Sequence, residues 1–526
     1  MSYSRKVEAK PTSWFNRIFC RRTLRRGLVG IVVLSLFLVL FYAEENWRGK
    51  RAWADYQRVL KAKGVDFNWR SLAPAPVADG DNFATTPFFA ALFDFTPGTH
   101  TPRDMAAYNR TAGFAQTGAP YEEQRSRDPV PAMLERRRTD LAAGLESFRK
   151  PKGPAKKADE TKPKEDSGDR TVAATAVLET LRPFSPVLEE LRAASRRPLA
   201  RFNFSYDADT TWRVPQPHLP VLKRVSRVLT LRASAALALH NTSAAADDVE
   251  LIIKLANSIR EEPFQSSHWA RYAMLANARQ IIWEGLADHR WSDGQLAKFE
   301  LLLTELRLLE YLQRPLRLEQ ASQNQFFDDL HRDPSIPKRW QFGPGIGNRV
   351  LPHFLWLMPT GWMYQEQVAY HRAFEGQLLP ALDPEGSKMQ SVRIHQIGHD
   401  GAPLLNHCFL SNLLLQSISR LLTETALAQT RNDEALLACA LERYRLANGQ
   451  FPGTLDALSP QCLAAIPADV ITRQLLKYRR MDDGQFQLYS VGWNGKDDGG
   501  KIGMNKEGNA PDDTQGDWVW PQYPDQ

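Results

Sequence analysis

The chain has 526 residues, of which 43% are hydrophobic and 24% charged, a composition typical of folded proteins with a sizeable core. At roughly 150 residues per domain, the length allows three or four domains. The net charge of +7 and the pI of about 9.1 are values common among nucleic-acid-binding proteins. However, residues 1–26 alone carry a net charge of +7, and beyond them 59 basic and 59 acidic residues cancel. We therefore expect no nucleic-acid partner.

The first distinctive segment is an uncharged run at residues 27–43, GLVGIVVLSLFLVLFYA. As a helix it would span about 25 Å, at the short end of what crosses the hydrocarbon core of a membrane. Basic residues precede it (Arg21, Arg22, Arg25 and Arg26), and two acidic residues follow it (Glu44 and Glu45). The positive-inside rule then predicts a cytoplasmic N-terminal tail and an exported body. We expect a single-pass signal-anchor in the lipid bilayer of the bacterial inner membrane, with most of the chain on the periplasmic side.

A cleavable signal peptide is the alternative interpretation of this segment. Signal cleavage requires small residues around the cut, but here Phe41 and Tyr42 precede Ala43. The basic lead of 26 residues is also long for a signal peptide. We therefore favour an uncleaved anchor.

The four cysteines exclude a disulfide scaffold. The predicted topology places Cys20 in the cytoplasm and leaves Cys408, Cys439 and Cys462 outside, enough for at most one internal disulfide. Cys439 and Cys462 are the first pair to test, and three buried, unpaired thiols are the favoured alternative.

After the anchor, residues 44–63 predict a polar helix that continues the membrane helix as a short stalk and ends at Gly64. Next, Leu72–Phe95 combines prolines with five phenylalanines, which favours irregular chain packed on a helical body over an exposed partner-binding strip. Residues 149–170 contain no aliphatic side chain larger than alanine, so they predict a disordered charged loop.

From Thr171 onward, helical periodicity dominates. Prolines 183 and 186 divide one pair of short helices. A helical hairpin is predicted over Leu219–Leu239 and Ala244–Ile259, followed by helices at Trp269–Leu286 and Gln295–Leu312. Ser292 and Gln295 form a capping box at the start of the last of these helices. The pairs suggest a tetratricopeptide-like stack, but no ~34-residue repeat matches that consensus, so we predict only an array of α-helical hairpins.

Further along, Pro334–Pro359 is rich in proline, glycine and tryptophan and predicts a loop. A helix is expected at Met363–Leu379. Leu404–Asn448 then predicts one long helix, either continuous or interrupted near Gln429–Asn432, with Gly449 as its C-cap.

The C-terminal region has a different texture. Short strands are predicted at Leu475–Arg479 and Gln485–Ser490, with a hairpin turn at Asp483-Gly484. The runs ALERYRLANGQFPGTLDAL (440–458), GQFQLYSVGWNGKDDGG (484–500) and DDTQGDW (512–518) resemble the soluble domain of a type II secretion major pseudopilin. The resemblance covers about the last 95 residues and implies a long helix packed on a small antiparallel sheet.

The same resemblance implies a calcium site in the last loop. Matching the family motif gives Asn494, Asp512 and Asp513 as ligands, with Ser490 nearby. Ca²⁺ binds six to eight hard oxygen atoms, which such residues supply. Asn494 stands where the family usually has aspartate, and the loop from Gly499 to Pro511 is longer than the family's. The alternative is a solvated acidic turn.

Four residues near position 400 are the candidates for a catalytic metal site. His395 and His399 are four residues apart, with Asp400 and His407 following, a spacing that on a helix could bind zinc. The glutamate of the zincin motif is missing, and loop histidines are the favoured interpretation. The sequence also lacks a Gly-x-Ser-x-Gly elbow, a Walker A loop and a dinucleotide fingerprint.

We therefore predict a mainly α-helical protein, built as a helical hairpin array with one transmembrane helix and a small C-terminal α+β domain. The predicted divisions are a tail (1–26), a transmembrane helix (27–43), a juxtamembrane segment (44–148), a disordered loop (149–170), a helical body (171–430) and a pseudopilin-like domain (431–526). The expected function is a membrane-anchored binding or assembly protein of the bacterial envelope, with envelope proteins as partners and no catalysis of its own. The alternative is an exported metal-dependent hydrolase with a site near His395–His407.

Overall fold

The computed structural model describes residues 21–96, 99, 101–116, 132–149, 170–204, 211, 214–333, 358–383, 388–391, 394, 397, 408–508 and 510–523. Its contacts divide the chain into two compact units. Unit 1 comprises Met1–Val65, Asn324–His371 and Ala402–Ser411. Unit 2 comprises Asp66–Gln323, Arg372–Gly401 and Asn412–Gln526.

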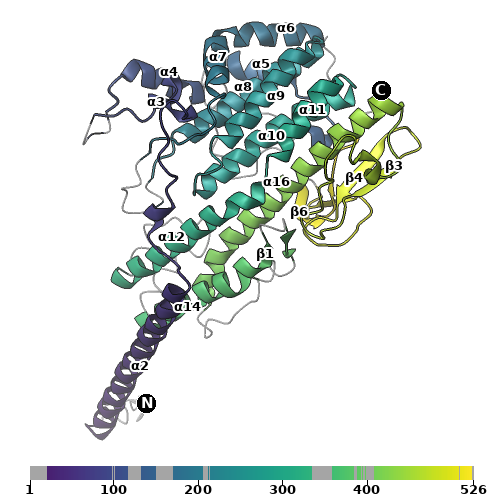
Figure 1. Cartoon of the computed structure of the whole chain (residues 1–526). Coiled ribbons are helices and arrows are strands. Elements are labelled where there is room, and N and C mark those ends of the chain that lie inside the picture. Colours follow the sequence, from purple (N-terminus) through teal and green to yellow (C-terminus); the bar gives the residue numbers. More distant parts are fainter. Residues whose placement is uncertain are drawn as a thin grey trace, which may run out of the picture. The chain divides into compact units, whose positions relative to one another are not determined.

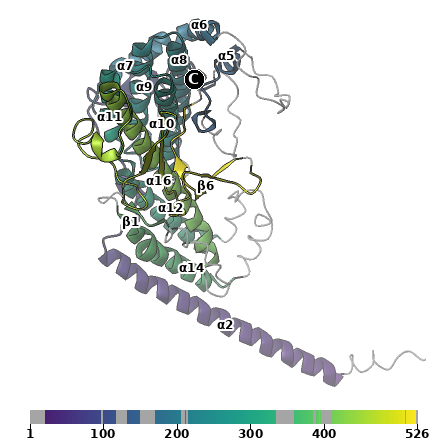
Figure 2. The same cartoon turned by 90° about the vertical axis from the view of Figure 1, so that its right-hand side faces the viewer.

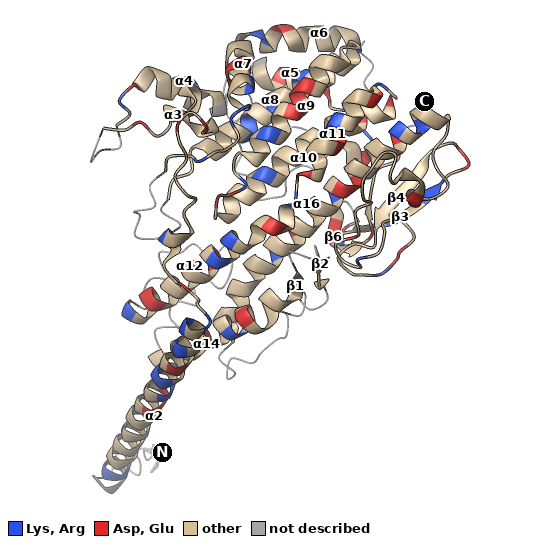
Figure 3. Ribbon diagram, viewed as in Figure 1, with Lys and Arg blue, Asp and Glu red and all other residues tan. Residues whose placement is uncertain are grey.

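Unit 1 begins with a single long helix, α2 (Arg21–Ala62), which joins the predicted anchor and the predicted polar helix without a break. Every side chain from Arg25 to Glu44 is exposed. Among the described residues, α2 is the one helix long and apolar enough to cross a membrane. Figure 3 shows its middle stretch without charged residues, between a basic first turn and a second half of mixed charge. The helix ends before Gly64, which has the positive φ (73°) expected there.

The second half of α2 is covered by protein along one face, so the expected stalk is a packed helix. Glu45, Gly49, Trp53 and Leu60 are buried at roughly helical spacing. In unit 1 this face lies against α14 (Thr360–Ala373), and residues 324–332 of α12 (Gln313–Arg332) pack on α14 in turn. Trp53 stacks on His371 of α14 with ring centroids 5.4 Å apart.

Unit 2 starts with the aromatic segment, which forms short helical turns: η1 (Trp69–Leu72), η2 (Phe83–Thr85) and α3 (Pro87–Ala90). Phe83, Phe88 and Phe89 are buried in its core, which confirms the core-packing interpretation. The next elements are α4 (Met105–Gln116), η3 (Ala132–Glu135) and α5 (Leu141–Arg149). Most of the predicted disordered loop, residues 150–169, lies outside the described part of the chain.

The helical hairpins follow as predicted. Their helices are α6 (Arg170–Leu181), α7 (Ser185–Ala194), α8 (His218–Ala238), α9 (Thr242–Asn257), α10 (Gln265–Ala287) and α11 (Asp293–Thr304). Helices α8, α9 and α10 pack against one another (Figures 1 and 2). The α8–α9 turn has His240 at φ 60°, and the side chain of Asn241 caps α9. The capping box of Ser292 and Gln295 is present.

The predicted extension of α11 to Leu312 is wrong. The helix ends at Thr304, and Leu308–Leu312 forms a separate 3-10 turn, η6. From Leu306 on, the backbone N–H groups donate to carbonyls two or three residues back in place of four, and the N–H of Leu308 also donates to Gln429 Oε1 (2.8 Å).

After α14 the chain forms a π-helical turn, η8 (Phe374–Leu378), a 3-10 turn, η9 (Leu379–Ala381), and a two-stranded ribbon of β1 (Leu382–Asp383) and β2 (Lys388–Met389). The long helix α16 (Phe409–Asn448) is continuous through residues 429–432, which decides between the two alternatives for this segment. It ends before Gly449, whose φ is 77°, as predicted. Residues 334–357 and 404–407, which belong to the predicted loop and helix, are outside the described residues.

The C-terminal region contains two small antiparallel sheets. One has the order β3 (Lys477–Arg480), β4 (Phe486–Ser490), β7 (Trp518–Val519), and the other pairs β5 (Ile502–Met504) with β6 (Pro511–Gly516). The predicted hairpin is confirmed, with Tyr478 opposite Leu488 and Gly484 at φ 83°. In Figure 1 the strands lie beside the C-terminal half of α16. Leu488 and Trp520 join the same buried core as the hairpin helices, so the fold is mainly helical with a few C-terminal strands.

Candidate functional site

The predicted calcium ligands lie in the loops after β4 and along β6, where they bond to nearby protein groups. Asn494 Oδ1 accepts from the N–H of Lys496 (2.9 Å), and Asn494 Nδ2 donates to Asp498 Oδ2 (2.9 Å). Asp512 Oδ1 accepts from the N–H and the Oγ1 of Thr514 (3.0 and 2.6 Å). The carbonyl oxygen of Asp513 accepts from Trp518 Nε1 (3.0 Å). Ser490, predicted to be nearby, is buried, and its Oγ accepts from the N–H of Gly492.

The structure neither confirms nor contradicts a calcium site at these residues. Across the described residues, no cluster of three or more His, Cys, Asp or Glu side chains is arranged to hold a metal ion. The calcium assignment therefore stays a prediction.

Asp517, which the sequence analysis missed, organises this loop. Its side chain is 1% exposed, and its two carboxylate oxygens accept from the backbone N–H groups of Asp498 (3.2 Å) and Gly500 (2.6 Å). The backbone N–H of Asp517 donates to the carbonyl of Lys501 (2.8 Å). Desolvation raises the pKa of Asp517, and the two N–H donors oppose the shift. Its place between Gly516 and Trp518 in DDTQGDW is the only sequence signal for this role.

Two further acidic residues complete the surface of the loop. Asp497 accepts from Tyr489 OH (3.0 Å) and pairs with Lys477 (3.3 Å), and the N–H of Gly499 lowers the pKa of its carboxyl. Asp498 is exposed and held by Asn494. Oxygen atoms suited to a hard cation are thus present, but they currently bond to N–H and O–H donors and to an ammonium group.

The structure supports no site at the other residues that the sequence singled out, the histidines near position 400 and the cysteines. His395, His399, Asp400 and His407 lie outside the described residues. Cys439 and Cys462 do not form the candidate disulfide. Cys439 is buried, as expected of an unpaired thiol, whereas Cys408 and Cys462 are partly exposed, so the expectation of three buried thiols is wrong for these two. Burial raises the pKa of Cys439 well above its usual value and also raises that of Cys462, so neither is an activated thiolate.

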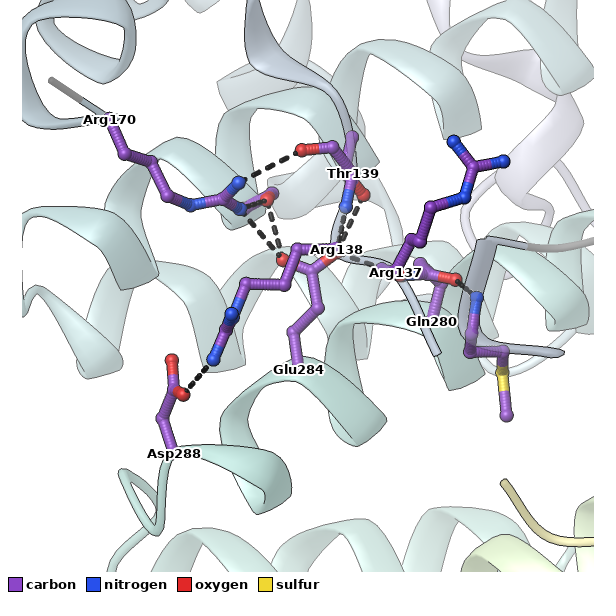
Figure 4. Close-up of polar contacts among 9 residues, drawn as sticks. Arg137, Arg138, Thr139, Arg170, Gln280, Glu284 and Asp288 are labelled. Carbon is purple, nitrogen blue, oxygen red and sulfur yellow. Dashed lines mark hydrogen bonds and ion pairs between the residues drawn. The ribbon is translucent and has the colours of Figure 1, made fainter. Parts of the chain in front are cut away.

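The most extensive polar contacts of unit 2 centre on Glu284 of α10 (Figure 4). Its Oε1 accepts from the N–H of Thr139 (2.8 Å), Thr139 Oγ1 (2.6 Å) and Gln280 Nε2 (2.9 Å). Its Oε2 accepts from Ser234 Oγ (2.6 Å) and Arg170 Nη2 (3.3 Å). The side chain is 2% exposed, so protein donors replace water around a buried charge.

This Glu284 network links four separate segments. Thr139 precedes α5, Arg170 begins α6, Ser234 belongs to α8, and Gln280 of α10 bonds back to the N–H of Met133 (2.7 Å). Arg138 pairs with Asp288 at the edge of the network. We conclude that Glu284 positions helices, because both its oxygens are occupied and little of it is open to a substrate.

A second buried polar group occurs in the middle of α16. Residues 430–434, Thr-Arg-Asn-Asp-Glu, are all at most 7% exposed. Arg431 pairs with Glu434 (3.0 Å) and donates to the carbonyl of Val519, and Asn432 Nδ2 donates to the carbonyl of Leu303 (2.9 Å). Desolvation is the main cause that raises the pKa of Asp433 and of Glu434 to about 7. The run therefore links α16 to the end of α11 and to β7.

No protein-family model, no curated protein and no solved structure matches this chain. The resemblance to major pseudopilins therefore rests on the motifs of the C-terminal region alone.

Proposed function

We propose that this chain is a membrane-anchored binding or assembly protein of the bacterial envelope, with its helical units on the exported side. One observation carries the proposal. In α2 the side chains from Gly27 to Ala43 are apolar and exposed, whereas the same helix from Glu45 onward is packed into unit 1. A continuous helix with these two halves suits a chain whose first half lies in lipid and whose second half belongs to a folded body.

Two features of unit 2 support a role in binding. Successive packed helical hairpins are an architecture that often presents extended binding surfaces. The long helix followed by an antiparallel sheet at the C-terminus has the element order that the pseudopilin resemblance implies. Pseudopilins are assembly proteins, so we infer an envelope protein as the partner.

The first experiment addresses export and partnership. A reporter that works only outside the cytoplasm is expected to be active when it is fused after Gln526. The full chain purified from membranes is expected to bring envelope proteins with it. Activity of a reporter that works only in the cytoplasm would contradict the proposal.

We further propose that the C-terminal loop binds calcium through Asn494, Asp512 and Asp513. Supporting features are the acidic side chains on the loop and the geometry of Asp517, which already holds the loop closed. Calcium titration of the purified full chain should show binding that Asp512→Ala and Asp513→Ala abolish. Asp482→Ala, in the exposed β3–β4 turn, is the control and should leave binding unchanged.

Metal analysis of the same samples separates this proposal from a hydrolase. Stoichiometric zinc that is lost on His399→Ala would favour the metal-dependent hydrolase, whereas calcium lost on Asp512→Ala supports the loop site. The two outcomes use different residues and different metals, so one cannot be mistaken for the other.

A further inference from the structure

The geometry of α2 assigns a depth to every residue near its membrane end. A helix rises about 1.5 Å per residue, so Glu45 lies about 3 Å and Trp47 about 6 Å beyond Ala43 along the axis. The headgroup layer on each side of a bilayer is about 5–8 Å thick, given a hydrocarbon core of about 30 Å and a total of about 40–45 Å. Residues from about Ala43 to Trp47 thus span one headgroup layer, and Phe41 and Tyr42 lie just below it.

The first turn of α14, also in unit 1, contacts α2 at the depth of this headgroup layer. The first turn of α14 contacts α2 through Trp362, whose Nε1 donates to Glu45 Oε2 (3.0 Å) and whose ring lies 6.3 Å from that of Phe41, edge to face. One residue earlier, the N–H of Gly361 donates to Asn46 Oδ1 (2.8 Å). All three α2 partners lie between residues 41 and 46.

The backbones are in direct contact at this point, which fixes the level of α14 closely. A Cβ atom built on Gly361 would lie 1.9 Å from the carbonyl oxygen of Glu45, and one built on Gly49 would lie 2.0 Å from that of Gly361. Only glycine at both positions allows the two helices to approach so closely. The first turn of α14 therefore cannot move away from α2 while this contact is kept.

The side chains around this level have the chemistry of a membrane interface. Tyr42 and Trp47 are exposed, and Trp362 is partly exposed. The guanidinium of Arg51 lies over the ring of Trp47 at 5.4 Å, and Arg48 is also exposed. Aromatic rings with a polar edge favour the headgroup layer, and long basic side chains reach phosphate groups from there.

We propose that unit 1 is seated directly on the bilayer, with the first turn of α14 in the headgroup layer and Trp362 in contact with phospholipid headgroups. The aromatic belt of this protein thus comes from two segments more than 300 residues apart. This inference rests on the proposed membrane anchoring of α2 and adds a second lipid-binding element to it.

The test measures fluorescence quenching of the full chain in phosphatidylcholine–phosphatidylglycerol vesicles that contain lipids brominated near the headgroup end of their chains. The chain has 14 tryptophans, so a single accessible ring contributes about one fourteenth of the emission. The emission that bromolipids quench should fall by about one fourteenth of the total emission on Trp362→Phe and on Trp47→Phe. It should stay unchanged on Trp53→Phe, because Trp53 is buried and about 15 Å beyond Ala43.

The outcomes distinguish a failure of the proposed seating of α14 from a failure of the proposed anchoring of α2. If Trp47→Phe lowers the quenchable emission and Trp362→Phe does not, the seating of α14 is wrong and the anchor stands. If neither variant lowers it, the anchoring itself is wrong. In case the loss of the Glu45 bond perturbs unit 1, a nitroxide on Met358→Cys gives an independent depth, with Cys20, Cys408 and Cys462 changed to serine. Met358 is partly exposed, lies two residues before α14 and takes no part in the hydrogen bonds described above. Greater accessibility to oxygen than to a water-soluble nickel complex supports the proposal, and the reverse overturns it.

Discussion

The two halves of α2 have the same backbone and opposite surroundings. From Gly27 to Ala43 the helix is apolar on every side, and all its side chains are exposed. From Glu45 to Leu60 it is polar overall, yet one face is buried against α14. The first half matches an apolar solvent, and the second matches a protein partner on one side and water on the other.

The two halves also differ in their charged residues. No residue from Gly27 to Ala43 is charged, which suits a segment in hydrocarbon, where an unpaired charge is unfavourable. In the covered half the buried carboxylate of Glu45 accepts from Trp362 and Gln365 and pairs with Arg48. The covered half can therefore be disrupted by changes in packing and pairing, and the exposed half by introducing charge.

The largest expected effect on stability comes from the α2–α14 contact. Gly361→Ala places a Cβ against the backbone of Glu45, so the helices must separate, and we expect unit 1 to lose about 3 kcal/mol or more. Gly113→Ala in α4, where nothing lies within 4 Å, is the matched control and should be neutral or stabilising by up to about 1 kcal/mol. Urea unfolding of the full chain in detergent measures both. Equal effects of the two variants would contradict the close contact.

A smaller loss of stability is expected at Glu284 in unit 2, which, like Glu45, is a buried carboxylate that accepts from protein donors and pairs with an arginine. Glu284→Gln replaces one acceptor oxygen by an amide group that faces donors and removes the anion beside Arg170, so the loss should be about 2 kcal/mol. Glu179→Gln, at an exposed position of α6, should change the free energy of unfolding by less than about 0.5 kcal/mol. An unchanged free energy of unfolding of the Glu284 variant would show that the Glu284 network does not hold the helices together.

The smallest effect is a pH dependence in unit 1. His371 is fully buried, and its Nε2 lies 3.2 Å from Asn324 Oδ1. Burial lowers its pKa to about 3, so the folded state binds fewer protons than the unfolded state below about pH 6.5. Its contribution to stability is therefore present above pH 6.5 and is lost as the pH falls. Between pH 7.5 and 5.5 the wild type should lose about 1 kcal/mol more than His371→Gln.

A histidine on the surface gives the control for this prediction. His240→Asn, at an exposed position whose positive φ asparagine tolerates, should leave the pH dependence unchanged. If His371→Gln has the same pH dependence as the wild type, His371 is not held neutral in the folded state.

Much of the helical architecture could be predicted from the sequence because it depends on local patterns. The apolar run of α2, the α8–α9 hairpin and the capping box at Ser292 are each specified within a few residues. The Gly49–Gly361 contact could not be predicted, because it joins residues far apart and glycine has no side-chain pattern. The end of α11 at Thr304 was also missed, because the apolar pattern continues through Leu312 although the backbone changes to shorter local bonds from Leu306 on.

The buried polar run of α16 shows a second limit. The polar residues near Gln429–Asn432 suggested an interruption, but their partners, such as the carbonyls of Leu303 and Val519, come from other elements. In the C-terminal loop, the motif identified Asn494, Asp512 and Asp513 and overlooked Asp517. The partners of Asp517 are backbone N–H groups, which every residue except proline carries and which no motif marks.

The most direct test of membrane anchoring through α2 is extraction of membranes with alkaline carbonate. We predict that the full chain stays in the pellet and is released by detergent, because the proposed anchor places residues 27–43 across the hydrocarbon core. Val33→Arg/Leu36→Arg places two charges in that core, at about 3 kcal/mol each, and should shift the chain to the carbonate-soluble fraction. Val172→Arg, at an exposed position of α6, should behave as the wild type. Release of the unchanged chain by carbonate without detergent would contradict the account.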